Sequence, residues 1–270
     1  MYLIIEQPDQ YRISINDRTL DQRELGWWRD IAFRKLDITG YLTAGHNRIV
    51  LARHFANSAE TYAAVARAQI FESESNKLFY DTEIESIYLL GNFHVHSDTG
   101  YILSDDSQIY TEGHFRLQEP VHTVQSGDLT TQGLNFYAGN VQLRQQLIVP
   151  ELDSGQQLWI RFERPNAVLS RLWLNGQEVH TFMWAPYAIE ITDYIRTGDN
   201  ELMIELMSSC RNLLGPHHHV RGELTMVGPD SFKDKPSWTD GDHPEEHIYT
   251  DRYCLTPFGL KGHVEVILYT

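Results

Sequence analysis

The chain has 270 residues, of which 41% are hydrophobic and 22% charged, so it can bury the core of one large domain or of two ordinary ones. Its 22 Lys and Arg residues against 37 Asp and Glu residues give a formal net charge of −15, which disfavours nucleic acid and anionic membranes as partners. No run of about 18 apolar residues is present, so we expect no membrane-spanning segment.

The cysteines and the first residues bear on the compartment. Cys210 and Cys254 are too few for a disulfide framework or a cysteine-based zinc site, and they favour two reduced thiols over one bridge. The segment from Met1 lacks a basic flank and an apolar core of signal-peptide length. We therefore expect a cytoplasmic protein, and an extracellular one remains open if Met1 is not the native start.

Short alternating runs of apolar and polar residues predict strands along the whole chain. In chain order the clearest runs are 13–15, 49–51, 141–144, 158–162 and 202–206. The one helical candidate is 58–69, which is rich in alanine and which Ser58 or Asn57 can cap. Asn175-Gly176 predicts a tight hairpin, because a type I′ turn needs positive φ at both central positions. The pattern predicts an all-β protein with one short helix.

The chain also repeats itself. The segment that starts at Tyr2 aligns with the segment that starts at Leu158, and the segment from Trp27 aligns with the one from Trp184. Each copy reads as a strand, an Asn turn, a Trp segment and then LDITGYL or IEITDYI. A weaker third match pairs 89–95 with 260–266. A period on the order of 155 residues indicates a duplicated domain rather than a solenoid.

The two copies are not equally complete. The second has a leading segment, 132–156, for which the first has no counterpart. We predict a first, N-terminally incomplete β-sandwich over 1–96, a polar linker over 97–132 that completes the first sheet or only joins the domains, and a second sandwich over 133–270. An unpaired edge strand invites association, so something should cover the edge in the first copy.

Four segments of the second copy resemble a known family: FYAGNVQLRQQLIVP (136–150), LWLNGQEV (172–179), WAPYAIEITDYIRTGDNELMIEL (184–206) and RNLLGPHHH (211–219). They resemble the sugar-binding-type jelly-roll domain of family 2 glycoside hydrolases, as in the C-terminal non-catalytic region of large bacterial rhamnosidase- or galactosidase-like proteins. The resemblance implies two tandem galactose-binding-like β-sandwiches with binding loops at one end. It brings no catalytic barrel, which needs about 250 residues by itself.

Aromatic and polar side chains near the Asn-turn hairpins are the candidate carbohydrate-binding residues. An aromatic face stacks on the C–H face of a sugar ring while polar neighbours bind its hydroxyls. The alternative, favoured because both copies keep a Trp at this place, is that these Trp residues are core or interdomain plugs. Arg29 and Asp30 are nearby polar groups. The predicted binding set is Trp27, Trp28, Trp184, Tyr187, Arg211, Asn212, His217 and His219.

Histidines and acidic loops raise the question of a metal. In an extended segment His217 and His219 share a face, and His94 with His96, or His243 with His247, would complete a metal site. The alternative is a polar loop that ties the sandwich together by side-chain-to-backbone hydrogen bonds. No catalytic cofactor is expected. A structural calcium site is a further hypothesis, on the oxygen-rich loops at Asp105-Asp106, Asp128 and Asp240-Gly241-Asp242.

The sequence favours a non-catalytic carbohydrate-binding or accessory module of a glycoside hydrolase system. Its partners would be a carbohydrate and a glycoside hydrolase catalytic domain, or a second copy at a self-association surface. No motif singles out the carboxylate pair that a glycosidase needs. Two alternatives stay open: a glycoside hydrolase, or part of one, that acts on plant or bacterial polysaccharide, and a purely architectural docking module.

Overall fold

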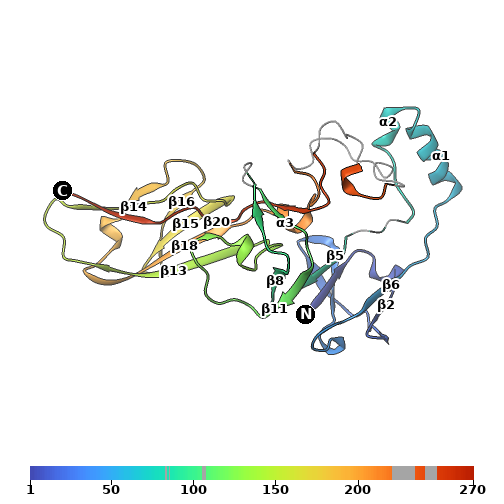
Figure 1. Ribbon diagram of the computed structural model, residues 1–270, viewed down its shortest axis with the longest axis horizontal. Helices are drawn as coiled ribbons and strands as arrows, with labels where there is room; N and C mark the ends of the chain where they lie inside the picture. The colour runs from blue at the N-terminus through green and yellow to red at the C-terminus, as the bar shows by residue number, and fades with distance from the viewer. Residues whose placement is uncertain (83, 85, 105–107, 221–234, 241–247) are drawn as a thin grey trace. The chain divides into compact units, whose positions relative to one another are not determined.

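The computed structural model describes residues 1–82, 84, 86–104, 108–220, 235–240 and 248–270. The chain divides into two compact units, Met1–Asn92 (unit 1) and Phe93–Thr270 (unit 2), each built of small antiparallel sheets (Figure 1). The predicted all-β class is therefore confirmed. No helix among the described residues is long and apolar enough to cross a membrane.

Unit 1 is a sandwich of two sheets with the strand orders β4-β5-β1-β7 and β3-β2-β6. Alternate side chains of both sheets point inward, and they form one core that includes Leu3, Ile13 and Leu36. The strands are β1 (Tyr2–Ile5), β2 (Arg12–Ile15), β3 (Arg18–Thr19), β4 (Glu24–Trp28), β5 (Asp30–Asp37), β6 (Ile49–Ala52) and β7 (Tyr88–Leu90).

The predicted helix is present in unit 1 as α1 (Ala59–Ala68), followed by the short α2 (Glu72–Ser75). Ser58 caps α1, because its hydroxyl accepts a hydrogen bond from the main-chain N–H of Thr61 at 3.2 Å. The Asp81 carboxylate accepts from the N–H of Ser58 and from the hydroxyl of Thr61, and these bonds hold its pKa below the ordinary value.

Unit 2 has a larger sandwich, with the sheets β13-β18-β15-β16 and β17-β14-β21. Its core contains Ile160, Leu172, Phe182 and Ile204. The fourteen strands of the unit that the structure describes are β8 (His94–Ser97), β9 (Ile102–Leu103), β10 (Ile109–Thr111), β11 (Phe115–Gln118), β12 (Gly127–Asp128), β13 (Asn140–Val149), β14 (Gln157–Arg161), β15 (Leu169–Leu174), β16 (Gln177–Phe182), β17 (Ala188–Glu190), β18 (Gly198–Met207), β19 (Tyr253–Leu255), β20 (Gly259–Leu260) and β21 (Glu265–Tyr269).

Residues 97–132, expected to be a linker, differ from that expectation because they carry strands that pair within unit 2. β11 pairs with β8, β10 lies between β9 and β19, and β12 pairs with β20. The sequence signal was weak because these strands are two to four residues long, too short for an alternating pattern.

An asparagine clasp, which we define as Asn175 and Asn200, closes one end of the unit 2 sandwich. Asn175 lies in the β15–β16 turn at φ 51°, and its Nδ2 donates to Oδ1 of Asn200 at 2.8 Å and to the carbonyl of Tyr194 at 3.2 Å. Its Oδ1 accepts from the N–H of Glu201. Asn200 in turn bonds the N–H and the carbonyl of Arg196 at 3.0 and 2.7 Å. Two side chains thus tie the hairpin to β18 and to the turn before it.

Unit 1 contains the same clasp, formed by Asn16 and Asn47. Asn16 also lies at φ 51°, and its Nδ2 donates to Oδ1 of Asn47 at 2.8 Å and to the carbonyl of Tyr41 at 3.0 Å. Its Oδ1 accepts from the N–H of Arg48, and Asn47 bonds both main-chain groups of Thr43. The internal repeat seen in the sequence is therefore a repeat of hydrogen bonding as well as of pattern.

Strand pairing sets the register of the repeat. Tyr2 lies opposite Asp37, and Trp159 lies opposite Glu190, so Tyr2 corresponds to Trp159, one residue beyond the predicted Leu158. The same equivalence places β7 on β21. Leu90 then matches Ile267, and the third match is shifted by several residues from the one predicted.

Replacing Asn200 with alanine tests the clasp. The side chain is 1% exposed, and its loss removes its hydrogen bonds to Asn175, Arg196 and Gly198, so we expect unit 2 to be destabilised by about 2–4 kcal/mol. Native-state hydrogen exchange of the β18 amides measures this segment by segment. The matched variant Asn47→Ala removes the exposed clasp of unit 1 and should cost less, about 1 kcal/mol at β6. Equal effects would contradict a role that depends on burial.

Candidate functional site

The loops at one end of the unit 2 sandwich converge, opposite the asparagine clasp. Arg161, the last residue of β14, lies opposite Ala188 and Glu265, the first residues of β17 and β21. Leu169, the first residue of β15, lies opposite Met207, the last of β18. The connections after β14, β16 and β18 therefore meet at one end, where loops present side chains on a rigid scaffold.

A cleft of about 510 Å³ opens among these loops. The cleft is formed by the connection that precedes β13, the β14–β15 loop, the segment after β18 and the residues on either side of β20. Its lining residues are Tyr137, Glu163, Arg164, Pro165, Asn166, Ala167, Val168, Ser208, Ser209, Asn212, Thr256, Pro257, Phe258 and Lys261.

Two aromatic rings form one wall of the cleft. The rings of Tyr137 and Phe258 lie 6.5 Å apart and nearly parallel, at 22°. The Tyr137 hydroxyl donates to the carbonyl of Asn140 at 2.8 Å, which fixes the ring. A Cβ at Gly139 would lie 2.8 Å from that hydroxyl, so the position needs glycine for the ring to lie where it does. Tyr137 is 36% exposed and presents its ring to the cleft, whereas Phe258 is 5% exposed and supports that ring from the core. The result is a fixed aromatic surface beside polar groups.

Asn212, a predicted binding residue, lines the cleft but is used by the fold. Its Oδ1 accepts from the N–H of Thr256 and its Nδ2 donates to the Thr256 carbonyl, both at 2.8 Å. Its own carbonyl accepts a hydrogen bond from His217 Nε2. The side chain is 6% exposed, so Asn212 positions the wall around Thr256 and offers little to a ligand.

Glu163, Asn166 and Lys261 offer more. Their side chains form no hydrogen bond or ion pair with the residues that the structure describes, and they border the aromatic wall. Asn166 is held by its main chain, which exchanges two hydrogen bonds with Gly259 at 2.9 and 3.0 Å. Sequence reasoning missed these residues and Tyr137, although Tyr137 falls inside the FYAGN segment that carries the family resemblance.

Trp184 and Tyr187 lie in the β16–β17 loop at the same end of the sandwich, because the N–H of Phe162 donates to the carbonyl of Tyr187. Trp184 is 71% exposed, which suits a stacking platform. Tyr187 instead packs into the core, with its ring 5.9 Å from that of Phe162 and 6.1 Å from that of Phe182. Of this pair, only Trp184 offers a ring to a ligand.

Trp27 and Trp28 belong to β4 of unit 1. Trp27 is 56% exposed, whereas Trp28 packs at 6.5 Å from the ring of Tyr88, and the Arg29 guanidinium lies 5.4 Å from its ring centre. The Asp30 carboxylate caps the hairpin by accepting from the N–H of Ala32. The unit 2 cleft is lined without these residues.

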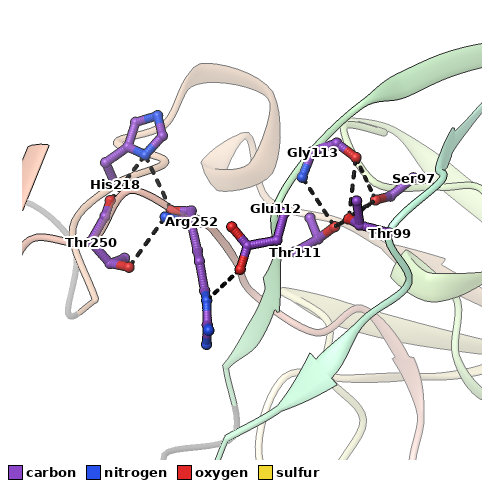
Figure 2. Close-up of polar contacts among 8 residues, drawn as sticks. All are labelled: Ser97, Thr99, Thr111, Glu112, Gly113, His218, Thr250 and Arg252. Atoms are coloured by element: carbon purple, nitrogen blue, oxygen red, sulfur yellow. Dashed lines mark hydrogen bonds and ion pairs between the residues drawn. The ribbon is translucent and has the colours of Figure 1, made fainter. Parts of the chain in front are cut away.

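The histidine segment after α3 (Arg211–Leu214) is bonded to main-chain atoms. His218 Nδ1 lies 3.1 Å from the carbonyls of Thr250 and Arg252, and the N–H of Thr250 donates to the His218 carbonyl (Figure 2). His219 is 1% exposed, with its ring 5.1 Å from that of Tyr249. These contacts are those of a segment that ties the fold together.

Side-chain hydrogen bonds also hold the β8–β11 region together. The hydroxyls of Ser97, Thr99 and Thr111 share hydrogen bonds, and that of Ser97 donates to the carbonyl of Gly113 at 2.7 Å (Figure 2). Arg252 Nε donates to Glu112 at 2.7 Å, and this exposed ion pair links the two segments.

Burial changes the acid–base behaviour of this region. It lowers the pKa of His217, against the opposing effect of the hydrogen bond to the Asn212 carbonyl. It also lowers the pKa of Arg211, whose Nη2 donates to the His219 carbonyl at 3.4 Å. The same burial raises the pKa of the Cys254 thiol. Cys210 and Cys254 are both free.

Only some of the candidate metal ligands lie in the described part of the chain. It contains no group of three or more His, Cys, Asp or Glu side chains arranged to hold a metal. The Asp128 carboxylate accepts from the N–H groups of Thr130, Thr131 and Phe258, and so acts as a main-chain cap. His94 Nδ1 accepts from the N–H of Val121. Several candidates lie outside the described residues: Asp105, Asp106, Gly241, Asp242, His243 and His247.

No family model matches the chain, and no curated protein matches it. Solved structures with partial likeness include a β-glucuronidase from Bifidobacterium dentium, at 24% identity over 34% of this chain and 16% of that one, with a TM-score of 0.29. A rhamnosidase from Novosphingobium sp. PP1Y is 17% identical over 99% of this chain and 22% of that one, with a TM-score of 0.34. A family 2 glycosyl hydrolase from Bacteroides cellulosilyticus is 15% identical over 48% and 19%, with a TM-score of 0.26.

The chain thus spans about a fifth of the length of these structures. Likeness of this degree identifies no shared site or activity.

His217 gives a pH prediction. Because its pKa is lowered in the folded protein, the stability from neutral His217 is present above its unfolded pKa of about 6.5 and is lost as the pH falls below it. The variant His217→Gln keeps a donor for the Asn212 carbonyl but has no imidazole to protonate. We therefore expect the variant to lose less stability between pH 8 and pH 5 than the unchanged protein. Urea unfolding at several pH values measures this.

The exposed residue Ser154, which has no ionisable side chain, supplies the control, since Ser154→Ala should leave the pH dependence unchanged. His94, whose pKa burial and His122 also lower, keeps part of the dependence in both variants. An unchanged slope in His217→Gln would show that the buried imidazole is not linked to folding.

Proposed function

We propose that the chain is a non-catalytic carbohydrate-binding module of a glycoside hydrolase system, and that the cleft of unit 2 binds the sugar. The observation that carries the proposal is the Tyr137–Phe258 wall beside the uncommitted side chains of Glu163, Asn166 and Lys261. The resemblance of segments 136–150 and 184–206 to sugar-binding jelly-roll domains supports the link to glycoside hydrolases.

This arrangement suits a sugar for chemical reasons. A pyranose has an apolar C–H face, which packs on an aromatic ring, and a rim of hydroxyls that donate and accept hydrogen bonds. Asn166 both donates and accepts, Glu163 accepts and Lys261 donates, so the three supply every kind of partner that hydroxyls need. Trp184 offers a second exposed ring at the same end of the unit.

Binding is favoured over hydrolysis. Glycosidases place two carboxyl groups about 5–9.5 Å apart across the scissile bond. Among the described residues that line the cleft, Glu163 is the one carboxylate, and it suits hydrogen bonding to a hydroxyl. The alternative that the chain is a glycoside hydrolase predicts release of aryl alcohol from aryl glycosides, and that assay separates the two functions.

A glycan array tests binding, with the full chain and with calcium present or removed. We expect specific binding that Asn166→Ala weakens about tenfold, as loss of a hydrogen bond of about 1.4 kcal/mol implies. Trp184→Ala should weaken the binding of only those ligands that are long enough to reach this second ring. Dependence on calcium would support the structural calcium hypothesis.

Glu163→Gln and Glu151→Gln form a matched pair of charge removals. Glu163 lines the cleft, whereas Glu151 is an exposed residue in the β13–β14 loop at the opposite end of the sandwich. Only the first should alter affinity or glycan preference. Binding that survives all cleft variants would exclude this cleft as the site.

A second candidate function is an architectural docking module for a catalytic domain. The observation that favours it is that the segment of unit 1 between β6 and β7 carries several exposed apolar side chains. Large exposed apolar areas are typical of association surfaces. A blank glycan array together with no hydrolysis would favour this function. The exposed side chains are Phe55, Tyr62, Ile70, Phe71, Phe79 and Ile84.

A further inference from the structure

The two units differ at one sheet edge. In unit 2, β18 lies between β15 and β13, and the ten-residue β13 pairs with all of β18. In unit 1, the equivalent strand β6 pairs with β2, and β6 is the last strand of its sheet as the structure describes it. Unit 2 therefore shows, within the same chain, what a covered edge looks like.

The main chain of β6 is arranged to accept a further strand. The N–H of Asn16 donates to the carbonyl of Arg48, so the main-chain groups of Arg48 point toward β2. Because the direction alternates along an antiparallel strand, those of Val50 and Ala52 also point toward β2. The N–H and carbonyl groups of Ile49 and Leu51 then point to the opposite side. In unit 2 the equivalent residues, Leu202 and Ile204, face Gln145 and Leu143 of β13.

The side chains show the same difference. Leu202 and Ile204 are 7% and 3% exposed beneath the sheet that β13 completes. Their counterparts in unit 1, Ile49 and Leu51, are only partly buried although they face the core. A covering strand would remove this apolar surface from water, which is favourable in proportion to the area buried.

We propose that the β6 edge binds an extended segment of a partner polypeptide, which adds to the sheet antiparallel to β6 in the register that β13 takes on β18. Addition of a strand to an exposed edge is a common mode of recognition, in which main-chain bonds give affinity and alternate side chains give specificity. The partner segment carries apolar side chains at the inward positions over Ile49 and Leu51, as Leu143 lies over Ile204 in unit 2.

Charge defines the outward positions of the partner. Arg12 and Arg48 are exposed on the outer face of this sheet, and neither forms an ion pair with a described carboxylate. A carboxylate opposite Arg48 would make a favourable cross-strand pair. The segment from Arg48 to His54 contains no acidic residue, so pairing of β6 with β6 of a second copy would not supply one. The partner is therefore a different, acidic strand.

The test uses the full chain and a synthetic ten-residue peptide with the sequence of β13, in which glutamate replaces Arg144 and Gln146. In the proposed register, the glutamate that replaces Gln146 lies opposite Arg48. The reason is that Gln146 lies opposite Glu201 in unit 2, and Glu201 is the counterpart of Arg48. We expect binding that protects the amides of Ile49 and Leu51 from hydrogen exchange. A control peptide with proline in place of Leu143 and Gln145 lacks the donors that face β6, and it should not bind.

A charge swap tests the register. Arg48→Glu should weaken binding of the glutamate peptide about three- to tenfold. It should strengthen binding of a peptide with lysine at the same two positions. Arg23→Glu, an exposed charge reversal outside this sheet, should leave both affinities unchanged. Three results would each overturn the proposal: no binding at about 1 mM, protection of β18 in place of β6, or sedimentation showing that a second copy occupies the edge.

Discussion

The structure depends on one interaction that occurs twice, the hydrogen bond between two asparagine side chains, Asn175 with Asn200 and Asn16 with Asn47. Each pair joins a hairpin turn to a strand and to the turn that precedes that strand, and the two asparagines are 25 residues apart in unit 2 and 31 apart in unit 1. The first asparagine can do this because it tolerates left-handed φ and still presents an amide to the main chain. In each unit, five main-chain groups that would otherwise need water or a further loop are satisfied by two side chains.

This use of side chains limits where the protein can bind a ligand. At the clasp end the side chains of both asparagines are committed to the main chain, so they are not available to a ligand. At the opposite end the connections carry side chains such as Glu163 and Asn166 that the fold does not use. A duplicated scaffold with one fixed end and one variable end can acquire specificity at the variable end without loss of stability.

The sequence was sufficient for features that depend on local pattern. Alternation gave the all-β class, Ser58 marked the helix, and Asn175-Gly176 marked the hairpin that bears the clasp. The cleft could not be found in this way, because Tyr137, Glu163 and Lys261 are brought together only by strand register. The histidines attracted attention as potential ligands, yet His218 and His219 are occupied or buried by contacts with residues about 30 positions away.

The difference between β6 and β18 links the partner strand to the stability of unit 1. Ile49 and Leu51 face the core without the cover that Leu202 and Ile204 have, and fully burying an aliphatic side chain contributes about 1.5–3 kcal/mol. Both residues are already partly buried, so a covering strand would add part of this amount to a stability that is typically 5–15 kcal/mol for a folded domain. A strand that binds only the folded edge must stabilise unit 1 by mass action. Because β18 has its cover within its own unit and β6 does not, the two copies have the same hydrogen-bonded frame but not the same dependence on a partner.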